Sequence, residues 1–281
     1  YGARRTLFSG SIQPSEFTKL VVVIYMSVWM ASKGENLRRI GLGLVPFGVL
    51  VGIISGLIFA EPDRSTAFLI IFTAGIMFCI ASLDIKQLTI MIVAGAATVA
   101  TVIASAGYAR QRVGDFLTFL SDPLTHEGAQ MEGFVESLKA GKLFGVGLTN
   151  GAAKYGVSLP HTDGIFAVIG EELGLLGCLV IIGLYLFLVY RGTRIALHAP
   201  NLLGLLMASG VTIWLALQAF INIAVAAAVL PTTGIPLPFL SYGGSAVVSA
   251  LAGVGVLLSV SCSPRLRWGN RWSRLSDPDG R

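Results

Sequence analysis

Seven long apolar stretches run along the chain, separated by short polar turns and by one long polar insertion. A helix needs about 20 apolar residues to cross the hydrocarbon core of a bilayer, and each stretch is close to or above that length. The expected spans are residues 15–33, 40–60, 65–83, 87–107, 164–190, 203–230 and 244–262. The pattern therefore predicts an all-α polytopic membrane protein, with residues 1–281 forming one membrane domain.

Two segments between the spans carry unusual patterns. The polar insertion, residues 108–163, is long enough to be functional, and it holds apolar residues at spacings that suit short helices: Phe134, Val135, Leu138, Leu143 and Phe144. Residues 231–245, between the last two spans, contain three prolines and three glycines. Irregular backbone at membrane depth must be buried in protein or line a cavity, so we predict a re-entrant segment there. Gln218 and Asn222, four residues apart on the preceding span, could line that cavity or bridge helices.

Composition supports a membrane protein and excludes an ordinary cytosolic enzyme. Hydrophobic residues make up 54% of the chain and charged residues 12%, against about 25% charged residues in a typical soluble domain, and mean hydropathy is +0.77. The short basic segments lie on the side of the C-terminus, which predicts a cytoplasmic tail (263–281) and an extracytoplasmic long loop. The tail arginines also suit anionic lipid, although a topogenic signal is the simpler interpretation. Cys79, Cys178 and Cys262 lie far apart and predict neither a disulfide framework nor a metal site.

Charged residues at the edges of apolar spans are expensive and are therefore candidates for function. Glu16 and Lys19 are three residues apart at the start of the first span, where an ion pair could anchor the helix or belong to a site. Asp163 directly precedes the fifth span and could be its N-cap or a functional carboxylate. Glu171 and Glu172 follow within that span, and at most one of them can share the face of Asp163.

Two functional classes fit this distribution of charge. One is an extracytoplasmic membrane enzyme whose carboxylate base acts on a lipid-linked substrate, and the other is a transporter or flippase that uses the acidic residues for coupling. The sequence holds no Walker loop, His-metal cluster or Gly-x-Ser-x-Gly elbow, so neither a nucleotide nor a metal site is indicated. Nothing in it points to nucleic acid.

Two long motifs narrow the choice. Residues 161–174 (HTDGIFAVIGEELG) and 230–245 (LPTTGIPLPFLSYGGS) resemble the signatures of the shape, elongation, division and sporulation (SEDS) family, the FtsW/RodA/SpoVE group of peptidoglycan glycosyltransferases. Residues 2–5 (GARR), 13–16 (QPSE, followed by Lys19) and 61–63 (EPD) resemble its other motifs in the same order. The resemblance covers essentially the whole chain.

The resemblance implies a fold, a reaction and partners. Family members have ten spans, so the seven here would be the last seven of that bundle, with the first three absent, and we expect these 281 residues alone to be inactive. The family polymerises lipid II into glycan strands outside the bacterial cytoplasmic membrane, together with a cognate class B penicillin-binding transpeptidase. Other membrane proteins of the divisome and membrane lipids are further expected partners. The amino-acid sequences of the two long motifs favour the division member of the family, which works at the septum, over the elongation member.

The resemblance also assigns residues. It places the catalytic base at Asp163 and implies that Glu16 and Lys19 tune or position it. Residues expected to contact substrate are Glu61, Asp63, Gln130, His161, Thr162, Ser241, Tyr242, Gly243 and Gly244. Lys19 or arginines of the outer loops are candidates to meet the pyrophosphate. A divalent cation (Mg²⁺ or Mn²⁺) is a candidate to assist the leaving group, although no ligand cluster predicts it. The alternatives are a lipid II flippase, the elongation polymerase of cell shape, and a scaffold that activates its transpeptidase.

Overall fold

The computed structural model describes residues 13–61, 63–82, 84–105, 107–121, 129–151 and 164–262. Over these ranges the chain is helical and has no strand, which confirms the all-α prediction. The helices are α1 (Pro14–Lys33), the 3₁₀ helix η2 (Gly34–Arg38), α2 (Leu44–Ala60), α3 (Arg64–Ser82), α4 (Ile85–Ser105), α5 (Gly107–Ser121), α6 (Ala129–Gly141), α8 (Ile165–Leu197), α9 (Leu202–Ala226) and α10 (Gly244–Cys262).

Length and composition suit several of these helices to a membrane. Among the described residues, α3, α8, α9 and α10 are long and apolar enough to cross a bilayer, and α2 and residues 85–101 of α4 are apolar but shorter. These findings support a polytopic membrane fold, and the count of seven spans stays a prediction. The second helix begins at Leu44 instead of residue 40, because Gly43 folds back onto Leu37, where a Cβ would lie 2.1 Å from the carbonyl oxygen.

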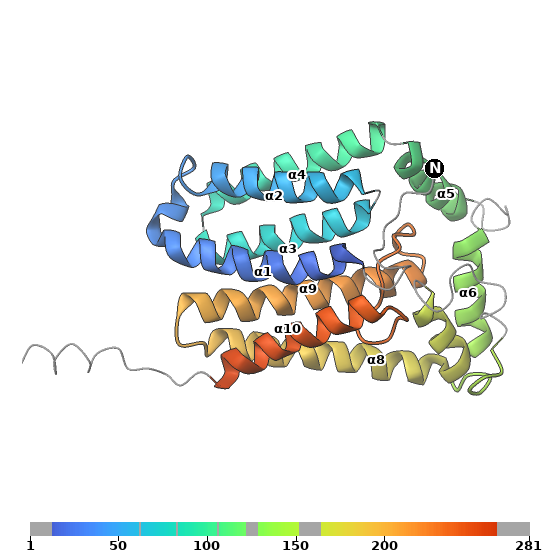
Figure 1. Cartoon of the computed structure of the whole chain (residues 1–281). Coiled ribbons are helices and arrows are strands. Elements are labelled where there is room, and N and C mark those ends of the chain that lie inside the picture. Colours follow the sequence, from blue (N-terminus) through green and yellow to red (C-terminus); the bar gives the residue numbers. More distant parts are fainter. Residues whose placement is uncertain are drawn as a thin grey trace, which may run out of the picture.

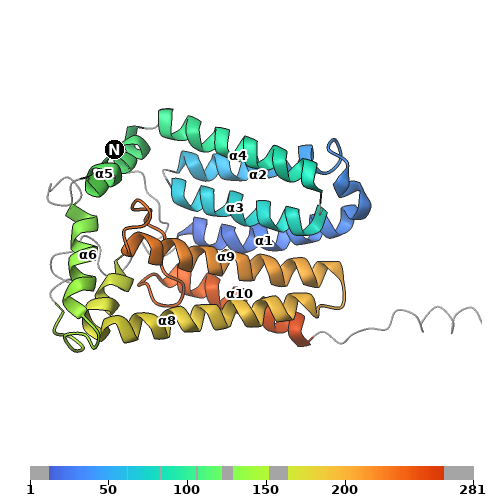
Figure 2. The ribbon, with the colours of Figure 1, turned by 180° about the vertical axis from the view of Figure 1, so that it is seen from behind.

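The long helices run side by side and define two ends of the molecule (Figures 1 and 2). Helices α5 and α6 lie across one end, which we call the loop end. The chain leaves α10 at the opposite end, which we call the tail end, where α8 also turns into α9. Helix α9 packs against α1, α3, α8 and α10, and so connects α1 and α3 with α8 and α10.

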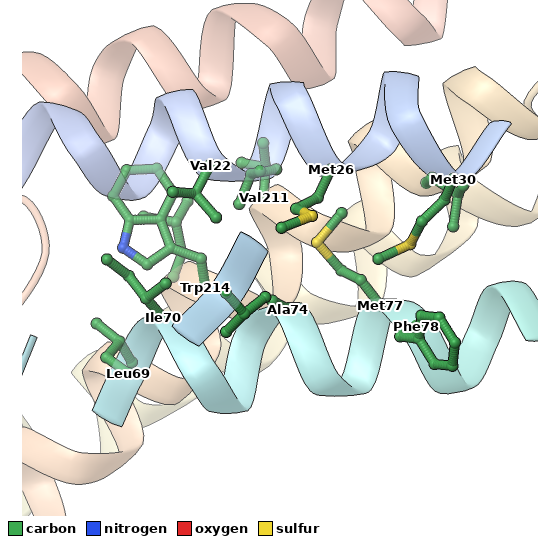
Figure 3. Packing of buried hydrophobic residues seen from close by; sticks show 14 of the residues in the cluster. Val22, Met26, Met30, Leu69, Ile70, Ala74, Met77, Phe78, Val211 and Trp214 are labelled. Atoms are coloured by element: carbon green, nitrogen blue, oxygen red, sulfur yellow. The ribbon is translucent and has the colours of Figure 1, made fainter. Parts of the chain in front are cut away.

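The core between α1, α3 and α9 is built from flexible and aromatic side chains (Figure 3). Met26 and Met30 of α1 and Met77 of α3 are fully buried, and Trp214 of α9 is 1% exposed. Gly210 makes the close approach possible, because a Cβ there would lie 2.7 Å from the sulfur of Met77. Helices in lipid associate through such close packing, since apolar lipid provides no hydrophobic driving force between them.

The surface is apolar where a soluble protein would be polar. Large side chains of α8 are at least half exposed along its length: Leu175, Leu176, Leu179, Val180, Leu184, Leu186 and Phe187. Exposed apolar patches of this extent are rare on soluble monomers, so the face of α8 is suited to lipid contact.

Candidate functional site at the loop end

A buried ion pair lies in the first turns of α1. The Nζ of Lys19 is 2.7 Å from a carboxylate oxygen of Glu16, and the two side chains are only 2% and 3% exposed. Pro14 and Ser15 begin the helix, as Pro does at the first helical position, and the three-residue spacing places both charges on one face. The predicted pairing of Glu16 with Lys19 is therefore present, in the interior of the bundle.

Helix α9 completes the surroundings of the lysine. Lys19 Nζ donates to Gln218 Oε1 at 3.2 Å, and Trp214 Nε1 donates to the same oxygen at 2.8 Å. The ammonium also lies 5.8 Å from the centre of a Trp214 ring, within the range of a cation–π interaction. Since Lys19 is fully engaged with Glu16, Gln218 and Trp214, these contacts favour a positioning role over contact with a pyrophosphate.

Polar side chains tie the start of α1 to two other helices. Ser15 Oγ donates to Asp63 Oδ2 at 2.9 Å, and Asp63 Oδ1 accepts from Thr66 N at 3.3 Å, so Asp63 also caps α3. On the other side, Ser249 Oγ of α10 donates to the backbone oxygen of Glu16 at 2.8 Å. The buried pair is therefore fixed to α3, α9 and α10 at once.

The segment that joins α9 to α10 folds back against the helices, as its prolines and glycines predict. Pro231, Pro236 and Pro238 lack an N–H and interrupt regular secondary structure, so several carbonyls of residues 231–238 need donors from elsewhere. Side chains from other helices donate to these carbonyls instead. The donors are Arg112 to Thr232 (2.6 Å), Ser65 to Thr233, Asn222 to Ile235 (2.8 Å), Gln218 to Pro236 (2.9 Å) and Tyr185 to Pro238 (2.5 Å). Gln218 thus links the buried ion pair to this segment.

Helix α8 is broken near its start. Gly174 has φ 68° and ψ −166°, a conformation that only glycine adopts readily. The backbone groups freed by the break bond to residues 142–147: Val146 N donates to Glu171 O at 3.0 Å, Gly147 N to Glu172 O at 3.1 Å, and Leu175 N to Lys142 O at 2.9 Å. The first two turns of α8 are therefore held by the loop that follows α6.

Comparisons with known proteins agree with this architecture. The FtsW/RodA/SpoVE family model, described as a cell cycle protein, matches residues 2–266. The chain belongs to this family. It is 38% identical over 258 residues to the probable peptidoglycan glycosyltransferase FtsW of Trichlorobacter lovleyi, a match that covers 91% of this chain and 67% of that protein. It is 37% identical over 252 residues to stage V sporulation protein E of Bacillus subtilis, covering 89% of this chain and 69% of that protein.

Solved structures share the fold. A chain from a peptidoglycan synthase complex that coordinates polymerization and crosslinking superposes with a TM-score of 0.72 at 28% identity, over 92% of this chain and 75% of that one. The rod shape determining protein RodA of Thermus thermophilus superposes with a TM-score of 0.60 at 25% identity, over 92% of this chain and 71% of that one. The family resemblance predicted from the motifs is confirmed.

The structure brings some of the predicted SEDS residues together and leaves others apart. Asp63 lies close to the start of α1, whereas Glu61 is exposed in the turn before α3 and Gln130 is half-buried in the first turn of α6. Asp163, His161 and Thr162 lie outside the described residues. Their roles stay predictions.

The residues of the last long motif divide into buried and exposed positions. Ser241 is 3% exposed, and its hydroxyl accepts from Leu237 N at 2.7 Å. Tyr242 is 84% exposed, Gly243 directly precedes α10, and Gly244 is its first residue. Of the four residues of this motif that are predicted to contact substrate, Tyr242 has the side chain most available to a ligand.

Sequence reasoning missed several residues of this site. Trp214, Ser249 and Tyr185 were not singled out, although each makes a contact described above. Arg112 was among the outer-loop arginines considered for the pyrophosphate, and the structure shows it donating to the backbone oxygen of Thr232. Trp214, Gln218 and Asn222 follow at four-residue intervals on α9, a spacing that could have indicated one polar face. The other donors come from distant helices, and no local pattern marks them.

Proposed function

We propose that this chain polymerises lipid II into peptidoglycan glycan strands on the outer face of the cytoplasmic membrane during cell division. Family membership supports this proposal, and the relatives with 34–38% identity include several named probable peptidoglycan glycosyltransferase FtsW. The observation that carries it is the buried Glu16–Lys19 pair, tied through Gln218 to the irregular segment 231–241 at the loop end. A charged pair at such depth is costly and is retained where it serves function.

The proposed chemistry is a glycosyl transfer assisted by a carboxylate base. Asp163 takes the proton of the 4-hydroxyl of the acceptor GlcNAc, the oxygen attacks the anomeric carbon of the donor MurNAc, and undecaprenyl pyrophosphate leaves with the bonding electrons. Asp163 immediately precedes Gly164, the N-cap of α8 at the loop end. Glu16 and Lys19 act as positioning residues. Among the described residues no cluster of His, Cys, Asp and Glu could hold a metal ion. A divalent cation that assists the leaving group stays a prediction.

The lipid part of the substrate has a suitable place in the bundle. Helices α2, α3 and α4 line an open cavity of about 480 Å³. Its lining is almost entirely apolar and includes Phe47, Val51, Phe59, Phe68, Ile71 and Met91. We propose that the isoprenoid chain occupies this cavity.

The proposed partner is a class B penicillin-binding transpeptidase. A related chain was solved as part of a complex that coordinates polymerization and crosslinking, which supports such an assembly here. Other membrane proteins of the divisome are proposed as further partners, and the C-terminus is proposed to face the cytoplasm.

The deciding experiment is lipid II polymerisation by the complete protein with its cognate transpeptidase. We expect Asp163→Asn to reduce the rate by at least a factor of 100, the scale of general base catalysis, while the complex stays intact. Asp84→Asn, at the tail end, is the matched control and should retain full activity, because within the described residues the Asp84 carboxylate accepts one hydrogen bond, from the backbone of Lys86, which an asparagine oxygen can also accept. Equal rates for wild type and Asp163→Asn would remove Asp163 from the chemistry.

The same preparation separates the alternatives. Transfer of labelled lipid II across a vesicle bilayer without any polymer would show a flippase. An intact complex that neither transfers nor polymerises lipid II, yet stimulates the transpeptidase, would show a scaffold.

A further inference from the structure

A second cavity lies at the tail end, far from the proposed catalytic site. It has a volume of about 230 Å³ and lies between α8 and α10. Its lining residues are Arg191, Arg194, Ile195, His198, Val260 and Ser261. Two guanidinium groups, an imidazole and a hydroxyl thus converge on one space, and this combination of donors suits a phosphate group.

Two of these basic side chains are held in place by α8 itself. The guanidinium of Arg194 lies 5.9 Å from the centre of the Tyr190 ring and donates to the Tyr190 hydroxyl at 3.3 Å. The Nδ1 of His198 donates to the backbone oxygen of Arg194 at 2.7 Å, and no other described residue bonds to the ring. A site with pre-oriented donors loses less conformational freedom when it binds.

The charge of the cavity is not neutralised by the described part of the chain. Within the described ranges the one ion pair is Glu16–Lys19, so neither Arg191 nor Arg194 is paired with a carboxylate there. Helices α8 and α10 both end at this cavity, and each C-terminus contributes about half a negative charge. The two arginines together outweigh that sum. In the sequence, Arg265 and Arg267 follow shortly after the end of α10 at Cys262.

The cavity also lies at a suitable depth. Along α8, the exposed apolar residues Leu184, Leu186 and Phe187 are followed by Tyr190, which is 54% exposed, and then by Arg191. The order of apolar, aromatic and basic residues marks the boundary between the hydrocarbon core and the lipid headgroups. Charges that serve only to set topology have no need to converge around a cavity.

We propose that this cavity binds the phosphate of an anionic phospholipid, phosphatidylglycerol or a lipid of the same headgroup charge, in the cytoplasmic leaflet. Basic pockets between membrane helices on this side favour such headgroups. The lipid would join the ends of α8 and α10 through one ligand.

Lipid titration of the complete protein in detergent, followed by native mass spectrometry, tests this site. The probes are dioleoylphosphatidylglycerol, dioleoylphosphatidylcholine and sodium phosphate. We expect Arg191→Gln with Arg194→Gln to weaken binding of the first phosphatidylglycerol roughly 10- to 30-fold, since each basic residue near a membrane surface contributes about fivefold. Arg38→Gln with Arg39→Gln is the matched control, because both arginines are exposed at the tail end outside the cavity, and it should change binding less than twofold.

Each other outcome overturns the proposal. Equal weakening by the two double variants would show a general charge effect, and no weakening by either would leave the cavity without a role. Saturable binding of phosphate, with no preference for phosphatidylglycerol over phosphatidylcholine, would assign the cavity to a soluble ion. Melting temperatures of both variants verify that folding is unaffected.

Discussion

The charges of Lys19 and Glu16 compensate each other, and neither charge could be buried in the bundle alone. Desolvating two charges costs several kcal/mol, and the pair offsets this only with good geometry and further hydrogen bonds. Gln218 and Trp214 provide those contacts on the side of the lysine. Removal of one member is therefore more damaging than replacement of both.

Lys19→Met is expected to destabilise the protein by about 3–5 kcal/mol, because it leaves the Glu16 carboxylate buried without its cation. Adding Glu16→Leu removes that charge and should restore most of the stability. Unfolding by denaturant in micelles measures both effects. Lys33→Met, at the far end of α1 where Lys33 is partly exposed, is the control and should cost less than about 0.5 kcal/mol.

Polymerisation by the same variants distinguishes the two interpretations of the pair. If Glu16 and Lys19 position the catalytic site, the double variant stays at least tenfold slower than wild type although its stability has recovered. Recovery of both stability and rate would show that the pair only anchors α1.

The sequence predicted this pair from spacing alone, but not its full environment. Two opposite charges three residues apart meet on a helix whatever surrounds them, so Glu16 and Lys19 could be paired in advance. Gln218 could only be assigned to cavity lining or helix bridging, and the structure shows it bridging to α1 and to residues 231–241. Which helix faces which depends on packing over the whole bundle, and no local pattern records that.

Among the elements, α8 carries the largest departure from a regular helix. Its first two turns and the remainder are separated at Gly174, where a Cβ would lie 2.4 Å from the backbone nitrogen of Gly145 and 2.6 Å from the carbonyl oxygen of Leu143. The loop after α6 takes the place of the missing helical hydrogen bonds. The position of the residue before α8, and so of the site, depends on this contact.

Gly174→Ala should therefore destabilise the loop end by at least about 1–2 kcal/mol, from the positive φ and from displacement of the loop. We expect faster proteolysis within residues 142–151 and slower polymerisation. Gly183→Ala is the matched control on the same helix, since a Cβ there meets nothing within 4 Å. It should be neutral or stabilise by up to about 1 kcal/mol.

Equal behaviour of the two alanine variants would contradict the role assigned to the break. The sequence could not have indicated it, because glycine is common in membrane helices and Gly174 resembles the other glycines of α8. The break is stabilised by hydrogen bonds to backbone that lies about thirty residues earlier in the chain. A pattern of side chains does not predict which backbone groups will form such bonds. The span itself was evident from its apolar length, and the short helix α6 from the spacing of Phe134 and Leu138.

At the scale of the whole molecule, buried amides occur at both ends of the bundle. Gln218 donates to Pro236 at the loop end, and Gln87 donates to the backbone oxygen of Leu37 at the tail end at 3.1 Å. Both side chains are at most 2% exposed. Their loss should lower stability in both cases and have different consequences for activity.

Gln87→Leu is expected to destabilise the protein by about 1–3 kcal/mol, since it leaves the buried carbonyl of Leu37 without its donor. Gln218→Leu should cost more, because Lys19 and Trp214 also lose their acceptor. Only Gln218→Leu should slow lipid II polymerisation, by tenfold or more, when both are assayed at a temperature where they remain folded. Thermal unfolding and a polymerisation assay on the same samples provide the comparison. An equal loss of rate in both variants would mean that activity follows overall stability.

The way residues 231–241 are held governs how the loop end can move. Arg112, Ser65, Tyr185, Gln218 and Asn222 come from α3, α5, α8 and α9, and each occupies a different carbonyl of the segment. A shift of any one helix against the others would break one or more of these bonds, most of which are partly buried. The segment therefore links four helices through side-chain hydrogen bonds to its backbone. If the loop end receives substrate as proposed, we expect entry and release to occur by concerted tilting of those helices, with the segment carried along as a rigid body.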